Sequence, residues 1–141
     1  IPTDYSPEAF KVALDNSNTN QNNKYLFWQG DWLAAIKVSS LDMIVSNPPY
    51  IEKEDPHLKQ GDVAFEPIQA LASGVDGLDD IRKIIAQAQI TLKPMGWLLI
   101  EHGYRQAKAV EFLFQQAGFA QVECYQDFGG NDRVTAGQLA L

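Results

Sequence analysis

The sequence is short of cysteine, of basic residues and of long apolar runs, and each shortage excludes a class of protein. Its one cysteine, Cys124, cannot form a disulfide within the chain, which is typical of a protein from a reducing compartment. Eleven basic residues stand against eighteen acidic ones, whereas proteins that bind duplex DNA nonspecifically need Lys and Arg to neutralise phosphates. No apolar run approaches the roughly 18 residues that span a membrane, and no signal-peptide pattern opens the chain. We therefore expect a cytoplasmic protein that is neither embedded in a membrane nor a nonspecific binder of nucleic acid.

The chain is long enough for one domain with a buried core. It has 141 residues, of which 45% are hydrophobic, as in ordinary globular proteins. The first residue is isoleucine, and Ile1–Asp4 has the pattern of a strand end followed by a loop. We therefore expect the chain to begin inside a larger protein.

The first third of the chain predicts one helix and two short strands. Ser6 and Pro7 suit the cap and the first position of a helix. The asparagine-rich stretch 16–23 predicts an exposed loop, because such side chains compete for backbone hydrogen bonds. Short strands are predicted over 25–28 and 43–45, and the second is wholly apolar, which is typical of a strand buried on both faces.

The rest of the chain predicts an irregular segment and then alternating helices and strands. Asp79 and Asp80 are expected to cap a helix that ends at Pro94. The later elements expected are a strand over 97–100, a helix over 110–117 and strands over 121–125 and 134–141. This order predicts an α/β fold, a parallel sheet with helices on both faces. Only about eight residues join the last two strands, too few for a parallel crossover, so the last strand should run antiparallel.

The segment Ser46–Tyr50 follows the apolar strand, where ligands bind in open α/β sheets. Asn47 offers a side-chain carbonyl, and Pro48 offers a backbone carbonyl without a competing N–H donor. Tyr50 offers a flat face with a polar tip. Two acceptors and a planar wall suit a planar –NH2 group, as in an amide or a nucleobase amine. The alternative is that the two prolines simply end the strand.

The stretch Asp42–Ile51 resembles motif IV of amino-group methyltransferases that use S-adenosylmethionine. Later stretches resemble the HemK/PrmC family, the protein-(glutamine-N5) methyltransferases of peptide chain release factors. The matching stretches are Asp62–Pro67, Ala70–Leu71, Gly77–Leu78, Leu98–Gly103 and Asp127–Val134. The resemblance implies a Rossmann-like methyltransferase sheet. The family's first strand, glycine-rich cofactor loop and N-terminal helical domain have no counterpart here, so residues 1–141 are expected to form part of the catalytic domain, truncated at its N-terminus.

The resemblance also implies roles for individual residues. Asp4 matches the acid that binds the cofactor ribose, and Trp32 matches a residue beside the cofactor adenine, whose amine Asp31 could contact. The implied substrate-amide site is Asn47, Pro48, Pro49 and Tyr50. Asn47 is the expected catalytic residue and also borders the cofactor. The implied cofactor is S-adenosylmethionine, and the implied substrate is the glutamine of the Gly-Gly-Gln loop in release factors.

Two other functions stay open at this stage. Adenine-N6 methylation of nucleic acid would use the same acceptors, and the chain could instead be a folded piece without activity. Between residues 51 and 80, two lysines stand against eight acidic residues, which favours a protein substrate over DNA. No metal site is expected, since His57 has no ligand spacing to another His or Cys. His102 is expected to be a structural histidine, Arg133 an ion-pair partner and Cys124 unreactive.

Overall fold

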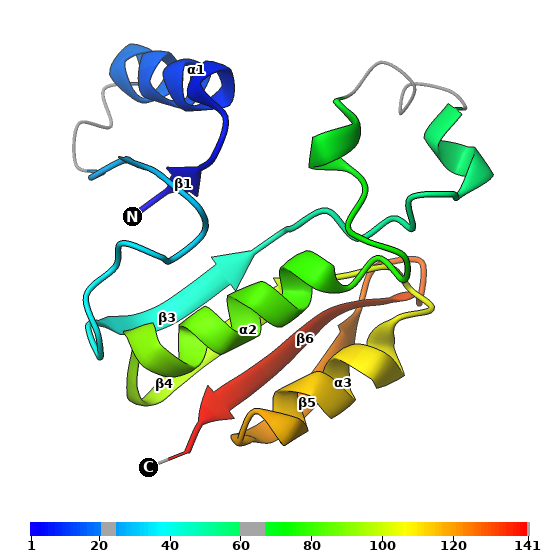
Figure 1. Ribbon diagram of the computed structural model, residues 1–141. Coiled ribbons are helices and arrows are strands. Elements are labelled where there is room, and N and C mark those ends of the chain that lie inside the picture. Colours follow the sequence, from blue (N-terminus) through cyan, green and yellow to red (C-terminus); the bar gives the residue numbers. More distant parts are fainter. Residues whose placement is uncertain (21–24, 60–66, 141) are drawn as a thin grey trace. The chain divides into compact units, whose positions relative to one another are not determined.

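The computed structural model describes residues 1–20, 25–59 and 67–140, which form two compact units, Ile1–Lys37 and Val38–Leu141 (Figure 1). The first unit contains strand β1 (Thr3–Asp4), helix α1 (Pro7–Thr19) and strand β2 (Trp28–Gln29). The two strands pair in parallel. The predicted strand over 25–28 is thus shorter and later, because only Trp28 of that range joins a ladder.

Helix α1 begins as predicted and ends later than expected. The Ser6 hydroxyl accepts a hydrogen bond from the Ala9 N–H at 3.2 Å, which caps the helix. The predicted loop over 16–23 is wrong for residues 16–19, which continue the helix, and residues 21–24 lie outside the described part. The Asn20 amide donates to the Asn16 carbonyl at 2.8 Å. The Asn20 backbone N–H also donates to this carbonyl, at 3.0 Å, so one asparagine caps the helix end through both its backbone and its side chain.

The second unit is a four-stranded sheet with two helices. Its elements are β3 (Leu41–Ser46), η1 (Pro56–Lys59), η3 (Ile68–Ala70), α2 (Asp79–Thr91), β4 (Leu92–Glu101), α3 (Ala107–Gln116), β5 (Phe119–Gln126) and β6 (Asp132–Leu139). The strand order is β3-β4-β6-β5. Strands β3 and β4 are parallel, and β6 runs antiparallel to both of its neighbours. The prediction of an antiparallel last strand is confirmed.

Helices α2 and α3 lie beside each other over one face of this sheet (Figure 1). The core beneath them includes Ile44, Leu98 and Phe114, each at most 7% exposed. On the other face Met43 is 55% and Val45 is 72% exposed. The prediction that the strand over 43–45 is buried on both faces is therefore wrong for the described residues. An all-apolar run of three residues does not reveal which faces of its strand are covered.

Both ends of helix α2 differ from the prediction. Leu78 is the N-cap residue, and Asp79 and Asp80 lie in the first turn, where the partial positive charge of the helix end favours carboxylates. At the other end the helix stops at Thr91, before Pro94, and strand β4 starts at once. The last helical carbonyls accept hydrogen bonds from the turn before β3. The Ser39 N–H donates to the Ile90 carbonyl at 2.9 Å, and the Ser40 N–H donates to the Thr91 carbonyl at 2.8 Å.

Candidate functional site

A pocket of about 230 Å³ opens directly after strand β3. Its wall consists of Asn47, Pro48, Pro49, Tyr50, Ile51, Ala70 and Leu71. Asn47 is exposed, Pro48 is buried, and the Tyr50 ring is half-buried. Within the described part of the chain, the Asn47 amide has no hydrogen-bond partner, so its carbonyl and amino groups remain available to a ligand. The structure therefore gathers the four residues of the expected amide site around one pocket.

The backbone behind this pocket is held by a short parallel bridge. Ile51 pairs with Ala72. The Ile51 N–H donates to the Leu71 carbonyl at 2.9 Å, and the Ser73 N–H donates to the Ile51 carbonyl at 2.9 Å. The two walls of the pocket, far apart in sequence, are thus joined by backbone hydrogen bonds, which fix the exit of the Asn47–Tyr50 turn.

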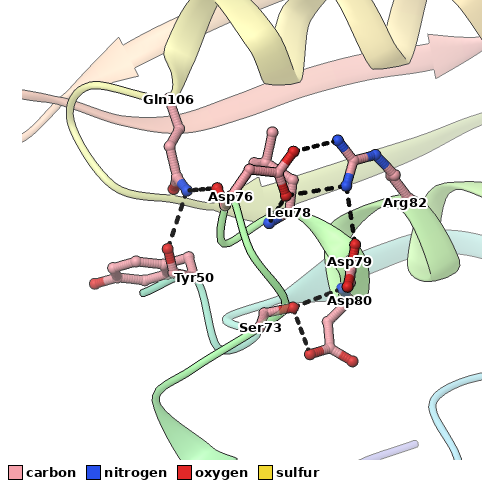
Figure 2. A network of polar contacts seen from close by, with 8 residues as sticks. All are labelled: Tyr50, Ser73, Asp76, Leu78, Asp79, Asp80, Arg82 and Gln106. Atoms are coloured by element: carbon pink, nitrogen blue, oxygen red, sulfur yellow. Dashed lines mark hydrogen bonds and ion pairs between the residues drawn. The ribbon is translucent and has the colours of Figure 1, made fainter. Parts of the chain in front are cut away.

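The side chain of Gln106 joins this turn to two other loops (Figure 2). Its Nε2 donates to the Tyr50 carbonyl at 3.0 Å and to the Asp76 carbonyl at 3.2 Å. Its Oε1 accepts from the Gly103 N–H at 2.9 Å. Sequence reasoning missed Gln106. The available signal was a polar side chain at the start of a helix, three residues after a glycine that ends a strand.

The loop before helix α2 is a network of charged and polar groups (Figure 2). The Arg82 guanidinium contacts both Asp76 and Asp79. Arg82 lowers the pKa of Asp76, and Asp76 in turn raises the pKa of Arg82. The Ser73 hydroxyl accepts from the Asp80 N–H and donates to the Asp80 carboxylate, both at 2.7 Å. Ser73 thus satisfies an N–H of the first helical turn, the role predicted for aspartates.

Of the residues expected at the cofactor, Asp4, Asp31 and Trp32 belong to the first unit, whereas Asn47 belongs to the second. Asp4 ends β1 and is paired with Gln29, so Asp31 and Trp32 follow directly after the neighbouring strand. One Asp4 carboxylate oxygen accepts from the Ser6 N–H at 2.8 Å. Trp32 is half-buried and takes a left-handed conformation, with φ of 52°, in the turn after β2. Asp4 is exposed and Trp32 is partly accessible, so both side chains can be reached by a ligand.

His102 has a structural environment, as expected from the sequence. Its side chain is fully buried, with Nε2 at 2.8 Å from the Thr135 hydroxyl and Nδ1 at 3.0 Å from the Gly103 carbonyl. Both ring nitrogens are therefore occupied within the fold. Cys124 lies in β5, where burial raises the pKa of its thiol. Since the thiolate is the nucleophile, a raised pKa agrees with the expected lack of reactivity.

The hairpin between β5 and β6 confirms the ion pair predicted for Arg133. Its Nε lies 3.2 Å from the Asp127 carboxylate. Asp127 also accepts from the N–H groups of Gly129 at 2.8 Å and Asn131 at 3.0 Å. Hydrogen bonds from the Asn131 backbone and side chain, with Arg133 and Gly129, lower the pKa of Asp127 to about 2. The turn is thus organised around one carboxylate.

The described residues contain neither a candidate metal site nor a membrane-spanning helix. No group of three or more His, Cys, Asp or Glu side chains could hold a metal ion. No described helix is long and apolar enough to cross a membrane. The prediction that His57 is solvated concerns a side chain that lies outside the described part of the structure. Residues 62–66 of the matching stretch Asp62–Pro67 also lie outside the described residues.

Comparisons with known proteins identify relatives by sequence and by fold. No protein-family model matches the chain. The release factor glutamine methyltransferase of Xylella fastidiosa (strain 9a5c) is 46% identical over 138 residues, which cover 98% of this chain and 50% of the relative. The chain spans about half the length of the curated relatives it matches.

Solved structures show the fold. The ribosomal protein L11 methylase of Lactobacillus delbrueckii subsp. bulgaricus matches 99% of this chain with 56% of its own, at a TM-score of 0.69 and 16% identity. A SAM-dependent methyltransferase of Methanosarcina mazei matches 99% of this chain with 81% of its own, at a TM-score of 0.56 and 15% identity. The predicted Rossmann-like methyltransferase fold is confirmed.

Proposed function

This chain belongs to the family of release factor glutamine methyltransferases, and we propose that the whole protein methylates release factors with S-adenosylmethionine. The methyl group would go to the side-chain amide nitrogen, N5, of the glutamine in the Gly-Gly-Gln loop. The observation that carries this proposal is the pocket formed by Asn47–Tyr50 at the carboxyl end of β3. The pocket wall combines a carboxamide that has no hydrogen-bond partner among the described residues with an aromatic ring and two rigid prolines, a surface suited to a second amide.

The pocket residues would act by orienting the substrate. An amide nitrogen is a weak nucleophile, because its lone pair is delocalised into the carbonyl group. Hydrogen bonds from the substrate N–H groups to Asn47 and to the Pro48 carbonyl would hold the nitrogen and favour a localised lone pair. The half-buried Tyr50 ring would keep water away from the amide plane. Fixing the nitrogen in one orientation makes the transfer effectively unimolecular.

The first unit offers the groups that would hold the cofactor. Asp4 is exposed and uses one carboxylate oxygen within the fold, which leaves the other oxygen to accept from a ribose hydroxyl. Trp32 would lie against the adenine ring, with Asp31 beside it as a second acceptor. When bound, S-adenosylmethionine supplies an electrophilic methyl group on a sulfonium. Asn47 would border both the cofactor and the amide.

A protein substrate suits the charge of the segment that follows the pocket. Residues 51–80 contain eight acidic and two basic residues. A DNA methyltransferase needs positive charge to hold phosphates while a base is flipped into its pocket. An acidic segment repels that backbone and complements a basic surface on a protein partner.

The test compares Asn47→Ala with Asn18→Ala in the protein at full length. Both variants lose an exposed asparagine side chain, but Asn18 lies on helix α1, outside the pocket. With labelled cofactor and release factor, Asn47→Ala should lower turnover on the order of 100-fold, because it removes a hydrogen bond to the reacting group. Cofactor affinity should fall far less.

Duplex DNA is offered to the wild-type protein in parallel as an alternative acceptor. The control Asn18→Ala should keep wild-type turnover. Wild-type turnover in Asn47→Ala would refute the assigned role of that residue. Label on DNA adenine, with none on the release-factor glutamine, would refute the substrate.

A further inference from the structure

We propose that Gln106 is a positioning residue that sets the orientation of the Asn47–Tyr50 turn, and this rests on the function proposed for that turn. Gln106 does not line the pocket. Its side chain reaches the turn from the start of helix α3, across 56 positions of sequence. It would therefore act through the backbone of Tyr50 and not on the substrate itself.

The hydrogen-bonding pattern requires the chemistry of a glutamine. One planar amide accepts from the Gly103 N–H at 2.9 Å and donates to the carbonyls of Tyr50 at 3.0 Å and Asp76 at 3.2 Å. An ionised glutamate lacks the two donors, and an asparagine is one methylene shorter. Figure 2 shows Gln106 above the Tyr50 carbonyl, with the loop of Asp76 at its side. Three backbone segments thus meet at one side chain.

Two glycines give a second and independent indication that the backbone is built around this contact. A Cβ atom at Gly77 would lie 2.3 Å from the Tyr50 carbonyl oxygen and 2.7 Å from the Gln106 Nε2. A Cβ atom at Gly103 would lie 2.9 Å from the Gln106 Oε1. Neither site has room for any larger residue while Gln106 keeps its place. The backbone at both glycines therefore lies too close to the Gln106 amide to leave room for a Cβ atom.

The contact matters to the pocket because of where the Tyr50 carbonyl lies. It belongs to the peptide group that joins Tyr50, a pocket residue, to Ile51, which is held by the bridge to Ala72. The bridge restrains one side of this peptide, and Gln106 restrains its oxygen. Loss of the second restraint would let the peptide rotate and shift the aromatic wall. A misplacement of about 1 Å can cost 100-fold in rate.

The experiment uses Gln106→Glu and the matched control Gln89→Glu in the protein at full length. Gln89 also donates through Nε2 to a backbone carbonyl, that of Ala117 at 2.8 Å, but it joins α2 to the end of α3. Gln106→Glu should lower turnover on release factor by about 10- to 100-fold at pH 8, while Gln89→Glu keeps wild-type turnover. Cofactor affinity should be the same in both.

A pH profile separates positioning from general loss of structure. The carbonyl oxygens of Tyr50 and Asp76 face the new carboxyl group, disfavour its charged form and raise its pKa above the usual value of about 4.3. A protonated glutamate can again donate to a carbonyl, so the turnover of Gln106→Glu relative to wild type should recover as the pH falls from 8 toward 5. If Gln106→Glu does not fold, Gln106→Met, which keeps the length without the hydrogen bonds, replaces it. Turnover of the Gln106 variant equal to that of Gln89→Glu at all pH values would overturn the proposal.

Amide hydrogen exchange tests the restraint without relying on catalysis. Exchange in peptides that contain Tyr50 and Ile51 should speed up in the Gln106 variant and stay unchanged in Gln89→Glu. If the wild-type protein transfers no methyl group to release factor, the proposed function fails. The exchange experiment still tests whether Gln106 restrains the peptide between Tyr50 and Ile51. Equal exchange in the two variants would refute it.

Discussion

Replacing Gly77 by alanine should destabilise the protein more than the same change at Gly118. Both glycines take a left-handed conformation, with φ of 71° at Gly77 and 77° at Gly118. An alanine there costs about 1–2 kcal/mol at either site. Gly118 has no atom within 4 Å of an added Cβ, so this backbone term is its whole cost.

Gly77 adds a steric term that Gly118 lacks. Its Cβ would lie 2.3 Å from the Tyr50 carbonyl oxygen, a backbone atom that cannot move aside as a side-chain end can. Overpacking of this kind costs a further 1–3 kcal/mol or so. We therefore expect Gly77→Ala to lose roughly 2–5 kcal/mol against about 1–2 kcal/mol for Gly118→Ala.

Urea unfolding of the full-length variants at 25 °C measures the difference. With a slope of about 2 kcal/mol per molar, the steric term should lower the midpoint of Gly77→Ala by roughly 1 M relative to Gly118→Ala. The same clash should push the Tyr50 peptide out of place, so Gly77→Ala should also lose methyl transfer while Gly118→Ala keeps it. Equal midpoints for the two variants would show that the loop yields freely and that our account of the close approach is wrong.

Two further predictions concern Asp127 and Cys124. The pKa of Asp127 is lowered to about 2, so its charge should stabilise the hairpin fully above the unfolded pKa and progressively less as the pH falls from about 4 toward 2. Urea midpoints of wild type and Asp127→Asn should therefore differ at pH 7 and converge near pH 2, and a difference that persists there would contradict the assignment. Burial raises the pKa of Cys124, so iodoacetamide should alkylate the folded protein at pH 8 more slowly than the urea-unfolded protein. Equal rates would contradict the environment described for the thiol.

Local sequence patterns predicted those features that depend only on residues close together in the chain. The spacing of Ile81, Ile84 and Ile85 in the sequence is typical of one apolar helical face, and in α2 all three are at most 4% exposed. Ser6 was recognised as a cap because its role depends only on residues within one turn. The short connection between the last two strands was enough to predict their antiparallel pairing.

Features that depend on distant residues could not be predicted in this way. The exposure of Val45 follows from which face of the sheet the helices cover, and nothing near Val45 in the sequence carries that information. The contact of Gln106 with Tyr50 joins residues 56 positions apart. The Asn47–Tyr50 motif was found because its chemistry is concentrated in four adjacent residues. Gln106 supports the same site from elsewhere and carries no motif of its own.

The strand order has a consequence for how the protein is synthesised. Strand β6 lies between β4 and β5 in the sheet, yet it follows β5 in the chain. The ribosome therefore synthesises β5, the outer strand, before β6, the inner one. The edge of β4 stays unpaired until β6 has emerged. Unpaired strand edges are templates for aggregation. The hydrogen bonds of the Asp127 turn join neighbouring residues only, and β5 pairs with β6, so this hairpin can form as soon as β6 has emerged and can then cover the edge of β4.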